Sequence, residues 1–289
     1  MLLYVKDATK VALNLGHGLI NGLGRVLGVI DFAVPPNSSM RKTSSRSVIH
    51  YYLSGLTTYL PIVTAAKLYG ITFTSETNVL DFGCGVGRQL LHMTRKCPRA
   101  KYFACDVDST LVTFILRHYP MVDTHVNKFI PPLRYSDGSM NLIYSVSTFS
   151  HFDLETQQLW LREFFRILRP GGLALLTIEG LHALEMMKDD FPDTPERARE
   201  LAEKGILYKE YWFLNQARKH EAGSPLSVAN RARGIEGSYG ATVMTPEFVF
   251  RSWSELGFEV MGISEGVIDQ RQDLVVLRRR ADTQLTGAQ

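Results

Sequence analysis

The feature that most constrains the fold is an alternation of short apolar runs and helical patterns that begins near Asn78. The apolar runs lie near residues 77–82, 100–106, 121–126, 140–146, 172–179, 258–267 and 272–279, and helical patterns lie near 87–97, 108–118 and 154–168. A further helix is expected from Thr245, where a threonine cap is followed by a proline at the first helical position. Such alternation is typical of βα units. The sequence therefore predicts an α/β fold with a doubly wound, mostly parallel seven-stranded sheet.

A long segment interrupts this alternation after the fifth run. Residues 181–242 are polar and have helical patterns in parts. They include the aromatic residues Tyr208, Tyr211, Trp212 and Phe213. In open α/β sheets, ligands bind at the carboxyl ends of the strands, and this segment leaves one of those ends. We therefore expect a helical lid insertion over the site, and an inert surface elaboration is the alternative.

The chain before the alternation is expected to be a helical N-terminal extension over residues 1–40, attached to a main domain at 41–289. Apolar residues recur at helical spacing from Val11 to Ile30. Several glycines weaken this helix, and the pair Pro35-Pro36 ends it. The helix either packs on the main domain or, as the alternative, holds residues 1–35 on a membrane surface.

Two shorter expectations concern the start of the main domain. Residues 37–46 are polar and are expected to form a loop. A helix is expected from Val48 to Tyr69, and Pro61 should kink or split it.

Composition and charge exclude some classes of function. Of the 289 residues, 45% are apolar and 21% are charged, with a net charge of +3. No basic stripe suited to a nucleic-acid partner is present, and no apolar run is long enough to span a membrane. The three cysteines have no metal-ligand spacing, so we expect reduced thiols in a cytoplasmic protein without a metal site. The N-terminus does not read as a secretory signal.

The sequence from Val79 to Arg88, VLDFGCGVGR, joins an apolar run to a glycine-rich turn and a helix start. Glycines let a ligand approach the backbone, and the helix start offers N–H groups to it. The dinucleotide fingerprint would require a third glycine where Arg88 stands. A pyrophosphate site also has no use for Asp81 on the preceding strand.

The pattern Asp-x-Gly-x-Gly-x-Gly resembles the first motif of class I S-adenosylmethionine-dependent methyltransferases. The resemblance implies that the turn cradles the methionine end of S-adenosylmethionine and that the acid helps to orient it. The positions that carry this expectation are Asp81, Gly83, Cys84, Gly85 and Arg88. For Cys84, no neighbouring base supports a nucleophilic role, and the turn requires only a small residue there.

A second acid supports the same cofactor. Asp106 ends the next apolar run, about 20 residues after the glycine turn, where a carboxylate can accept hydrogen bonds from both ribose hydroxyls. Val107 follows and is expected to pack on the adenine face. The alternative for Asp106 is a helix cap, but Asp108 is the better cap.

The stretch PPLRYSDGSMNLIYSVSTFSHF, at residues 131–152, resembles the adenine-side loop and fourth strand of this family. The resemblance implies that Asn127 bonds the adenine amine and that Ser145 lines the methionine end. Met140 and Asn141 depart mildly from the family pattern. The turn LRPGG at 168–172 also matches the family. The resemblance covers residues 45–180 well and 243–280 loosely.

Methyl transfer from a sulfonium mainly requires donor and acceptor to be held in line. A base is needed only for a poor nucleophile such as a hydroxyl. His151 follows the fourth strand and Glu179 ends the fifth, so these are the candidate catalytic residues. The alternatives are a helix-start residue bonded to backbone for His151 and an ion pair that anchors the lid for Glu179.

We therefore expect methylation of a small-molecule acceptor, mainly at oxygen. A lipid or polyprenyl acceptor at a membrane surface is one alternative, and a non-catalytic cofactor-binding scaffold is another. Base-amine methyltransferases of this fold carry an Asp/Asn-Pro-Pro-aromatic motif after the fourth strand. This chain has Ser145-Val146-Ser147-Thr148 there, which argues against a nucleic-acid substrate.

Overall fold

The structure is a computed structural model that describes residues 32–43, 45, 47–210 and 239–281. Its strands are β1 (Asn78–Phe82), β2 (Lys101–Asp106), β3 (Val122–Val126), β4 (Met140–Ser145), β5 (Leu168–Glu179), β6 (Ile206–Glu210), β7 (Gly240–Met244), β8 (Phe258–Ile268) and β9 (Gln272–Arg279). Its α-helices are α2 (Asn37–Lys42), α3 (Val48–Leu68), α4 (Arg88–Lys96), α5 (Ser109–His118), α6 (Leu154–Ile167), α7 (Pro195–Lys204) and α10 (Pro246–Ser254). Two 3₁₀ turns are η1 (Phe149–His151) and η2 (Leu181–Met186).

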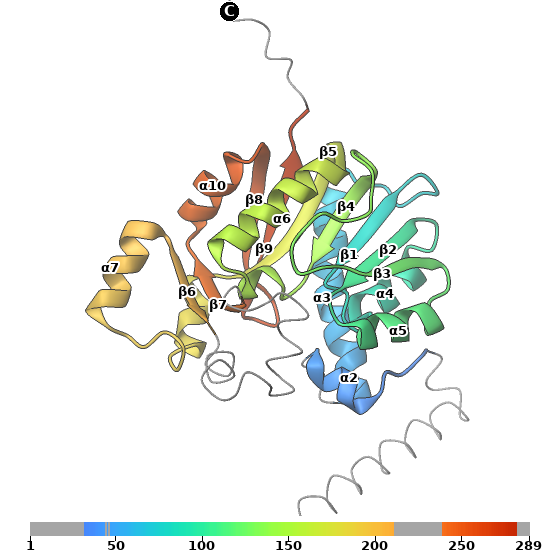
Figure 1. Cartoon of the computed structure of the whole chain (residues 1–289), viewed down its shortest axis with the longest axis horizontal. Helices are drawn as coiled ribbons and strands as arrows, with labels where there is room; N and C mark the ends of the chain where they lie inside the picture. The colour runs from blue at the N-terminus through green and yellow to red at the C-terminus, as the bar shows by residue number, and fades with distance from the viewer. Residues whose placement is uncertain (1–31, 44, 46, 211–238, 282–289) are drawn as a thin grey trace, which may run out of the picture.

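The seven predicted strands are all present and form one sheet (Figure 1). Strands β3, β2, β1, β4 and β5 are parallel neighbours in that order. Strand β9 then pairs antiparallel with β5, and β8 pairs antiparallel with β9. Since the carboxyl ends of the five parallel strands lie at one edge, the loops that leave them gather at the same end of the molecule.

Apolar side chains on the two faces of the sheet make two separate cores. On β5, Leu173 and Leu175 belong to the core that contains α3, α4 and α5, whereas Ala174 and Leu176 belong to the core that contains α6 and α10. This alternation follows from the two-residue period of a strand. The result is a doubly wound arrangement of helices on both faces (Figure 1), as expected.

Two expectations about the chain before β1 are wrong. The segment 37–46 was expected to be a loop, but it contains the helix α2, whose Met40 is buried. Helix α3 runs unbroken from Val48 to Leu68 with Pro61 inside it. The neighbouring Ile62 and Val63 are buried in the core, so packing offsets the hydrogen bond that the proline removes.

The N-terminal extension lies mostly outside the described residues. Its helical pattern from Val11 to Ile30 and the proposed membrane contact fall there, and so does most of the segment 1–35. Phe32, the first described residue, stacks on Tyr51 and Tyr52 of α3, with ring centroids 6.2 and 5.4 Å apart. Among the described residues, no helix has both the length and the apolar character that crossing a bilayer requires.

In its described residues, 181–210 and 239–242, the insertion contains strands as well as helices, which corrects the expectation of a helical lid for these residues. It contains η2 and α7, but also β6 and the first residues of β7. These two strands pair antiparallel, and Val243 of β7 pairs with Glu179 at the end of β5. Within the described residues, β6 and β7 therefore extend the sheet beyond its seven predicted strands. Tyr208 lies in β6, whereas Tyr211, Trp212 and Phe213 lie outside the described residues.

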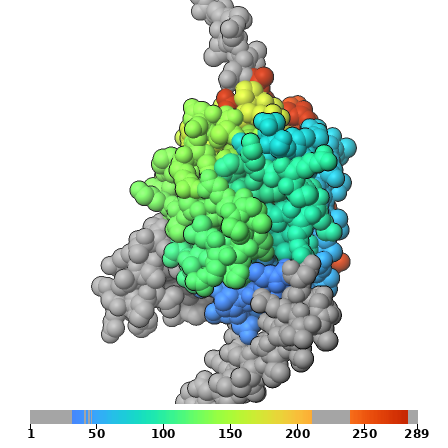
Figure 2. All heavy atoms as spheres, turned by 90° about the vertical axis from the view of Figure 1, so that its right-hand side faces the viewer, coloured from blue at the N-terminus to red at the C-terminus, as the bar shows by residue number. Residues whose placement is uncertain are grey.

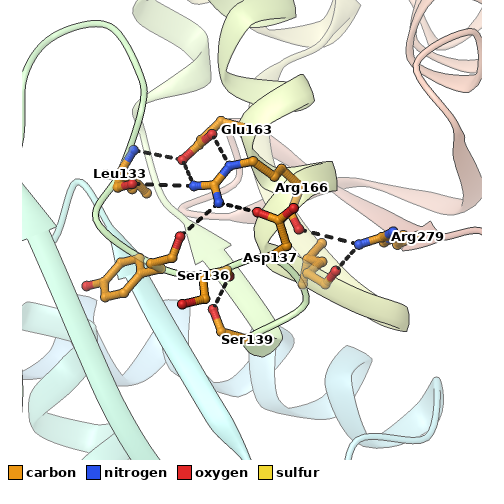
Figure 3. Close-up of polar contacts among 9 residues, drawn as sticks. Leu133, Ser136, Asp137, Ser139, Glu163, Arg166 and Arg279 are labelled. Atoms are coloured by element: carbon orange, nitrogen blue, oxygen red, sulfur yellow. Dashed lines mark hydrogen bonds and ion pairs between the residues drawn. The ribbon is translucent and has the colours of Figure 1, made fainter.

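The loop between β3 and β4 is held against α6 by a partly buried polar network (Figure 3). Arg166 of α6 bonds both carboxylate oxygens of Glu163, at 2.9 and 2.6 Å, and donates to the carbonyl of Tyr135. Glu163 in turn accepts from the backbone N–H of Leu133 at 2.7 Å. Because charge-assisted bonds of this kind are strong, the loop is fixed in position beside the end of β3.

Candidate active site

The glycine turn after β1 forms one wall of a cavity of about 1090 Å³. Gly83 and Gly85 have φ angles of 73° and 55°, in the left-handed region. A Cβ on Gly83 would lie 2.5 Å from the Thr148 hydroxyl, and one on Gly85 would lie 2.7 Å from a methyl group of Thr43. Only glycine suits both positions, and the turn therefore presents bare backbone to the cavity.

Asp106 at the end of β2 lies beside this turn, as its spacing predicted. One carboxylate oxygen accepts from the N–H of Gly85 at 2.9 Å, and the other accepts from the N–H of Asp108 at 2.8 Å. Asp106 and Val107 both line the cavity. Since a carboxylate has about four acceptor positions, Asp106 keeps the capacity to bind hydroxyl groups of a ligand.

Asn127, just after β3, lines the same part of the cavity. Its amide nitrogen donates to the carbonyl of Lys128 at 2.7 Å. Its amide oxygen is buried and has no hydrogen-bond partner. A buried acceptor without a partner is costly, so a donor from a ligand would stabilise this position.

Two predicted cofactor residues stand behind the cavity wall rather than on it. Asp81 is buried and accepts a bond from the Tyr144 hydroxyl at 2.9 Å. The Ser145 hydroxyl donates to the carbonyl of Phe82 at 2.9 Å, and its side chain is also buried. Neither is among the cavity-lining residues. In this structure both support β1 and β4, which carry the wall.

Cys84 and Arg88 do line the cavity. Burial raises the pKa of the Cys84 thiol well above its ordinary value, so the group stays protonated and serves as a small residue in the turn. The Arg88 guanidinium donates to the Ser54 hydroxyl at 3.3 Å, while its buried Nε has no partner. Burial lowers the pKa of Arg88. This cation is therefore available to an anionic group near the glycine turn.

His151 in η1 lies on the cavity wall beneath β7. Its Nδ1 is 3.0 Å from the carbonyl oxygen of Gly240. A carbonyl can only accept, so Nδ1 carries the proton and Nε2 carries the lone pair of the neutral ring. Burial lowers the pKa of His151; the bond to Gly240 raises it in part, and the charge of Arg271 lowers it further. The neutral ring is therefore the main form at neutral pH.

Glu179 at the end of β5 also lines the cavity, and it forms an ion pair. The alternative expected for this residue was an ion pair that anchors the lid. The partner is Arg271, in the turn between β8 and β9, whose Nε lies 2.9 and 3.1 Å from the two carboxylate oxygens. Gln272 adds a bond to the same carboxylate at 3.2 Å. Arg271 and Gln272 belong to the main domain, so the pair does not anchor the insertion.

Several cavity-lining residues were not predicted from the sequence. They are Lys42, Thr43, His50, Ser147, Thr148, Tyr239, Asp269, Arg271 and Gln272. The register of β5 on β9, in which Glu179 is opposite Gln272, brings the last two to the site. Lys42 bonds Asp108 at 2.7 Å, and the side chain of Thr43 lies against Gly85, so the end of α2 lies beside the glycine turn. The α2 segment is blue, near the lower end of the view in Figure 2. No local pattern in the sequence indicates either contact.

Residues 79–172 match the family model described as a methyltransferase domain. This segment is a class I S-adenosylmethionine-dependent methyltransferase domain. It contains β1, the glycine turn, Asp106, Asn127 and His151. The cofactor of the family is S-adenosylmethionine.

Two curated relatives match the methyltransferase region. A demethylmenaquinone methyltransferase from Chlorobaculum parvum is 26% identical over 44% of this chain and 52% of its own length. A malonyl-[acyl-carrier protein] O-methyltransferase from Dechloromonas aromatica is 27% identical over 46% of this chain and 48% of its own. The chain thus matches about half the length of each of these relatives.

Solved structures show the same fold at low identity. An S-adenosylmethionine-dependent methyltransferase from Methanosarcina mazei aligns with a TM-score of 0.51 at 15% identity, over 75% of this chain and 98% of its own. The PH0226 protein from Pyrococcus horikoshii aligns with a TM-score of 0.50 at 14% identity, over 76% of this chain and 89% of its own. At these identities the likeness concerns the fold alone.

The residues of the methyltransferase domain fit its cofactor. The glycine turn leaves space that a Cβ would fill, Asp106 has acceptor capacity for hydroxyls, and Asn127 has an acceptor without a partner. Seven of the nine predicted cofactor residues line the cavity, namely Gly83, Cys84, Gly85, Arg88, Asp106, Val107 and Asn127. In the described part of the chain, no group of three His, Cys, Asp or Glu side chains is placed to hold a metal ion.

Proposed function

We propose that this chain transfers a methyl group from S-adenosylmethionine to a small-molecule acceptor, and that the accepting atom is the oxygen of a hydroxyl group. The observation that carries the proposal is that one cavity is lined by the glycine turn and Asp106 and also by His151. S-adenosylmethionine supplies a sulfonium-bound methyl group. The names of the two relatives, one acting on demethylmenaquinone and one on a malonyl-carrier protein as an O-methyltransferase, support a non-nucleic-acid acceptor.

His151 is the residue that we assign to the acceptor proton. With the proton of the neutral ring on Nδ1, Nε2 is the atom that would accept the hydroxyl proton as the oxygen gains its methyl group. Glu179 already accepts hydrogen bonds from Arg271 and Gln272, so we assign it to positioning Arg271 rather than to proton transfer.

Release of S-adenosylhomocysteine on addition of fractionated cell extract, with mass analysis of the methylated product, tests the activity. We expect His151→Ala to lower turnover about 100-fold or more, a typical contribution of a general base, and to leave cofactor affinity within threefold. Because the pKa of His151 is lowered, wild-type turnover should be level above pH 6.5 and fall only at more acid pH. Unchanged turnover in the variant would exclude this base. Cofactor binding without release of S-adenosylhomocysteine would support a non-catalytic scaffold instead.

A lipid or polyprenyl acceptor at a membrane surface is the second candidate. It is favoured by the outer side of α3, where Ile49 and Leu53 have 71% and 52% of their surface exposed and flank His50 on the cavity wall. Co-sedimentation with phospholipid vesicles, with and without residues 1–35, tests this candidate. Equal recovery of both proteins in the supernatant would remove it.

A further inference from the structure

Arg271 is a positively charged side chain that lines the cavity together with His151. Its side chain is 45% exposed, whereas that of its partner Glu179 is only 4% exposed. A ligand in the cavity therefore has more access to the guanidinium than to the carboxylate. Gln272, the residue after Arg271, bonds the hydroxyl of Ser150, the residue before His151, at 3.4 Å, and the charge of Arg271 lowers the pKa of that histidine.

The position of Arg271 is fixed on several sides. It follows Asp269 and Gln270, two residues with left-handed φ angles of 51° and 57° that make the turn between β8 and β9. Its Nε binds both oxygens of Glu179. Gln272 bonds that carboxylate and is itself bonded by the Ser147 hydroxyl at 2.9 Å. The guanidinium is thus pre-organised, which reduces the entropy that a ligand would have to offset.

The outer edge of this guanidinium has unused donors. Only Nε takes part in the ion pair, and no described residue accepts a bond from Nη1 or Nη2. Two terminal amino groups in a planar fork match the two oxygens of a carboxylate or a phosphate. We propose that Arg271 binds a carboxylate or phosphate group of the acceptor and so selects anionic acceptors. This inference rests on the proposed function, because it concerns the acceptor side of the same cavity.

The other charged groups of the cavity have separate assignments. Asp106 lies at the glycine turn, Lys42 is paired with Asp108, and Arg88 directly follows Gly87 at the end of the glycine turn. Arg88 is therefore the cation nearer to the amino-acid end of the cofactor. Arg271 stands instead at the end of β5, beside the residue that we assign to the acceptor proton.

Calorimetric titration of anions into protein saturated with S-adenosylhomocysteine tests the proposal, because the cofactor's own carboxylate is then already bound. The probes are inorganic phosphate and benzoate, with benzamide as the neutral isostere of benzoate. We expect at least one anion to bind the wild-type protein with a Kd below 10 mM, and benzamide to bind at least tenfold more weakly than benzoate. Arg271→Gln should weaken the binding of that anion at least tenfold.

Further variants keep the test valid if Arg271→Gln alone is unstable, since that change leaves the buried Glu179 without its partner. The single variant Glu179→Gln serves as the reference for the double variant, and adding Arg271→Gln to it should weaken anion binding at least tenfold relative to Glu179→Gln alone. Arg134→Gln, at an exposed arginine that pairs with Asp123 and does not line the cavity, should bind as wild type does.

Three results would overturn the proposal: no anion bound by the saturated wild-type protein, equal binding by the variants that lack Arg271, or anion binding only when S-adenosylhomocysteine is absent. The last result would assign the arginine to the cofactor carboxylate. Failure of S-adenosylhomocysteine itself to bind would count against the proposed function, and the two failures are therefore distinguishable.

Discussion

Asp81 was expected to help orient the cofactor, but its side chain does not line the cavity. Its carboxyl group is buried behind the cavity wall, where the Tyr144 hydroxyl is its hydrogen-bond partner. Burial raises the pKa of Asp81 to about 7; the Tyr144 bond opposes this rise, and the nearby charge of Asp106 adds to it. Without a ligand, the protein therefore bears an energetic cost for ionising Asp81 above neutral pH.

The pH dependence of stability should report this cost. The folded-state pKa is above the ordinary value of 3.8, so the group stabilises the fold at low pH and that stability is lost as the pH rises to about 7. We expect Asp81→Asn, which still accepts the Tyr144 bond, to raise the free energy of unfolding at pH 8. The gain should be smaller at pH 5. Urea unfolding of both proteins at the two pH values measures it, and an equal gain at both values would contradict the prediction.

The site residues that could be predicted from the sequence are those that belong to a recognisable motif. Gly83, Gly85 and Asp106 meet at the cavity because they end neighbouring parallel strands. Arg271 and Gln272 could not be predicted, since they reach Glu179 through the antiparallel register of β9 on β5. That register depends on the packing of the whole sheet, and no local spacing encodes it.

Among the elements, the glycine turn gives the sharpest test. Gly83→Ala should cost about 1–2 kcal/mol for the left-handed backbone, and more for the contact with the Thr148 hydroxyl. The same change should weaken the binding of S-adenosylhomocysteine at least tenfold. Gly171→Ala is the matched control, because Gly171 has a φ of 76° and nothing within 4 Å of its Cβ position. The control should be destabilised only by the backbone cost and should bind S-adenosylhomocysteine as the wild type does. Similar affinities in the two variants would refute this role for the turn.

The strands and long helices were predicted closely because their apolar periods are regular. Helix α6, for example, begins after its cap Asp153 and buries Trp160 and Phe164. The short elements were missed for a physical reason. Helix α2 has six residues and is held by the burial of Met40 and the bond from Lys42 to Asp108, which are tertiary contacts. Strand β6 in turn depends on its pairing with β7.

In the molecule as a whole, the cavity joins segments that are distant along the chain. The proposed cofactor side comes from β1, β2 and the residue after β3, whereas the proposed acceptor side comes from η1, the end of β5 and the β8–β9 turn. The edge of β5 opposite β4 is occupied by β9, and β7 pairs with β5 only at Glu179. A bond from Thr242 to the Phe152 carbonyl ties β7 to the end of η1. A ligand that contacts both sides should therefore stabilise the assembled sheet.

The central claim is that the glycine turn and Asp106 form the binding site of S-adenosylmethionine. Calorimetric titration of S-adenosylhomocysteine into the wild-type protein, Asp106→Ala and Asp123→Ala tests it most directly. Asp123→Ala is the control, because Asp123 lies exposed on β3 in an ion pair with Arg134 and does not line the cavity. We predict one site per chain in the wild-type and control proteins, with affinity at least tenfold weaker in Asp106→Ala, a loss of about 1.4 kcal/mol or more. Equal affinity in all three proteins, or no binding to the wild type, would contradict the account.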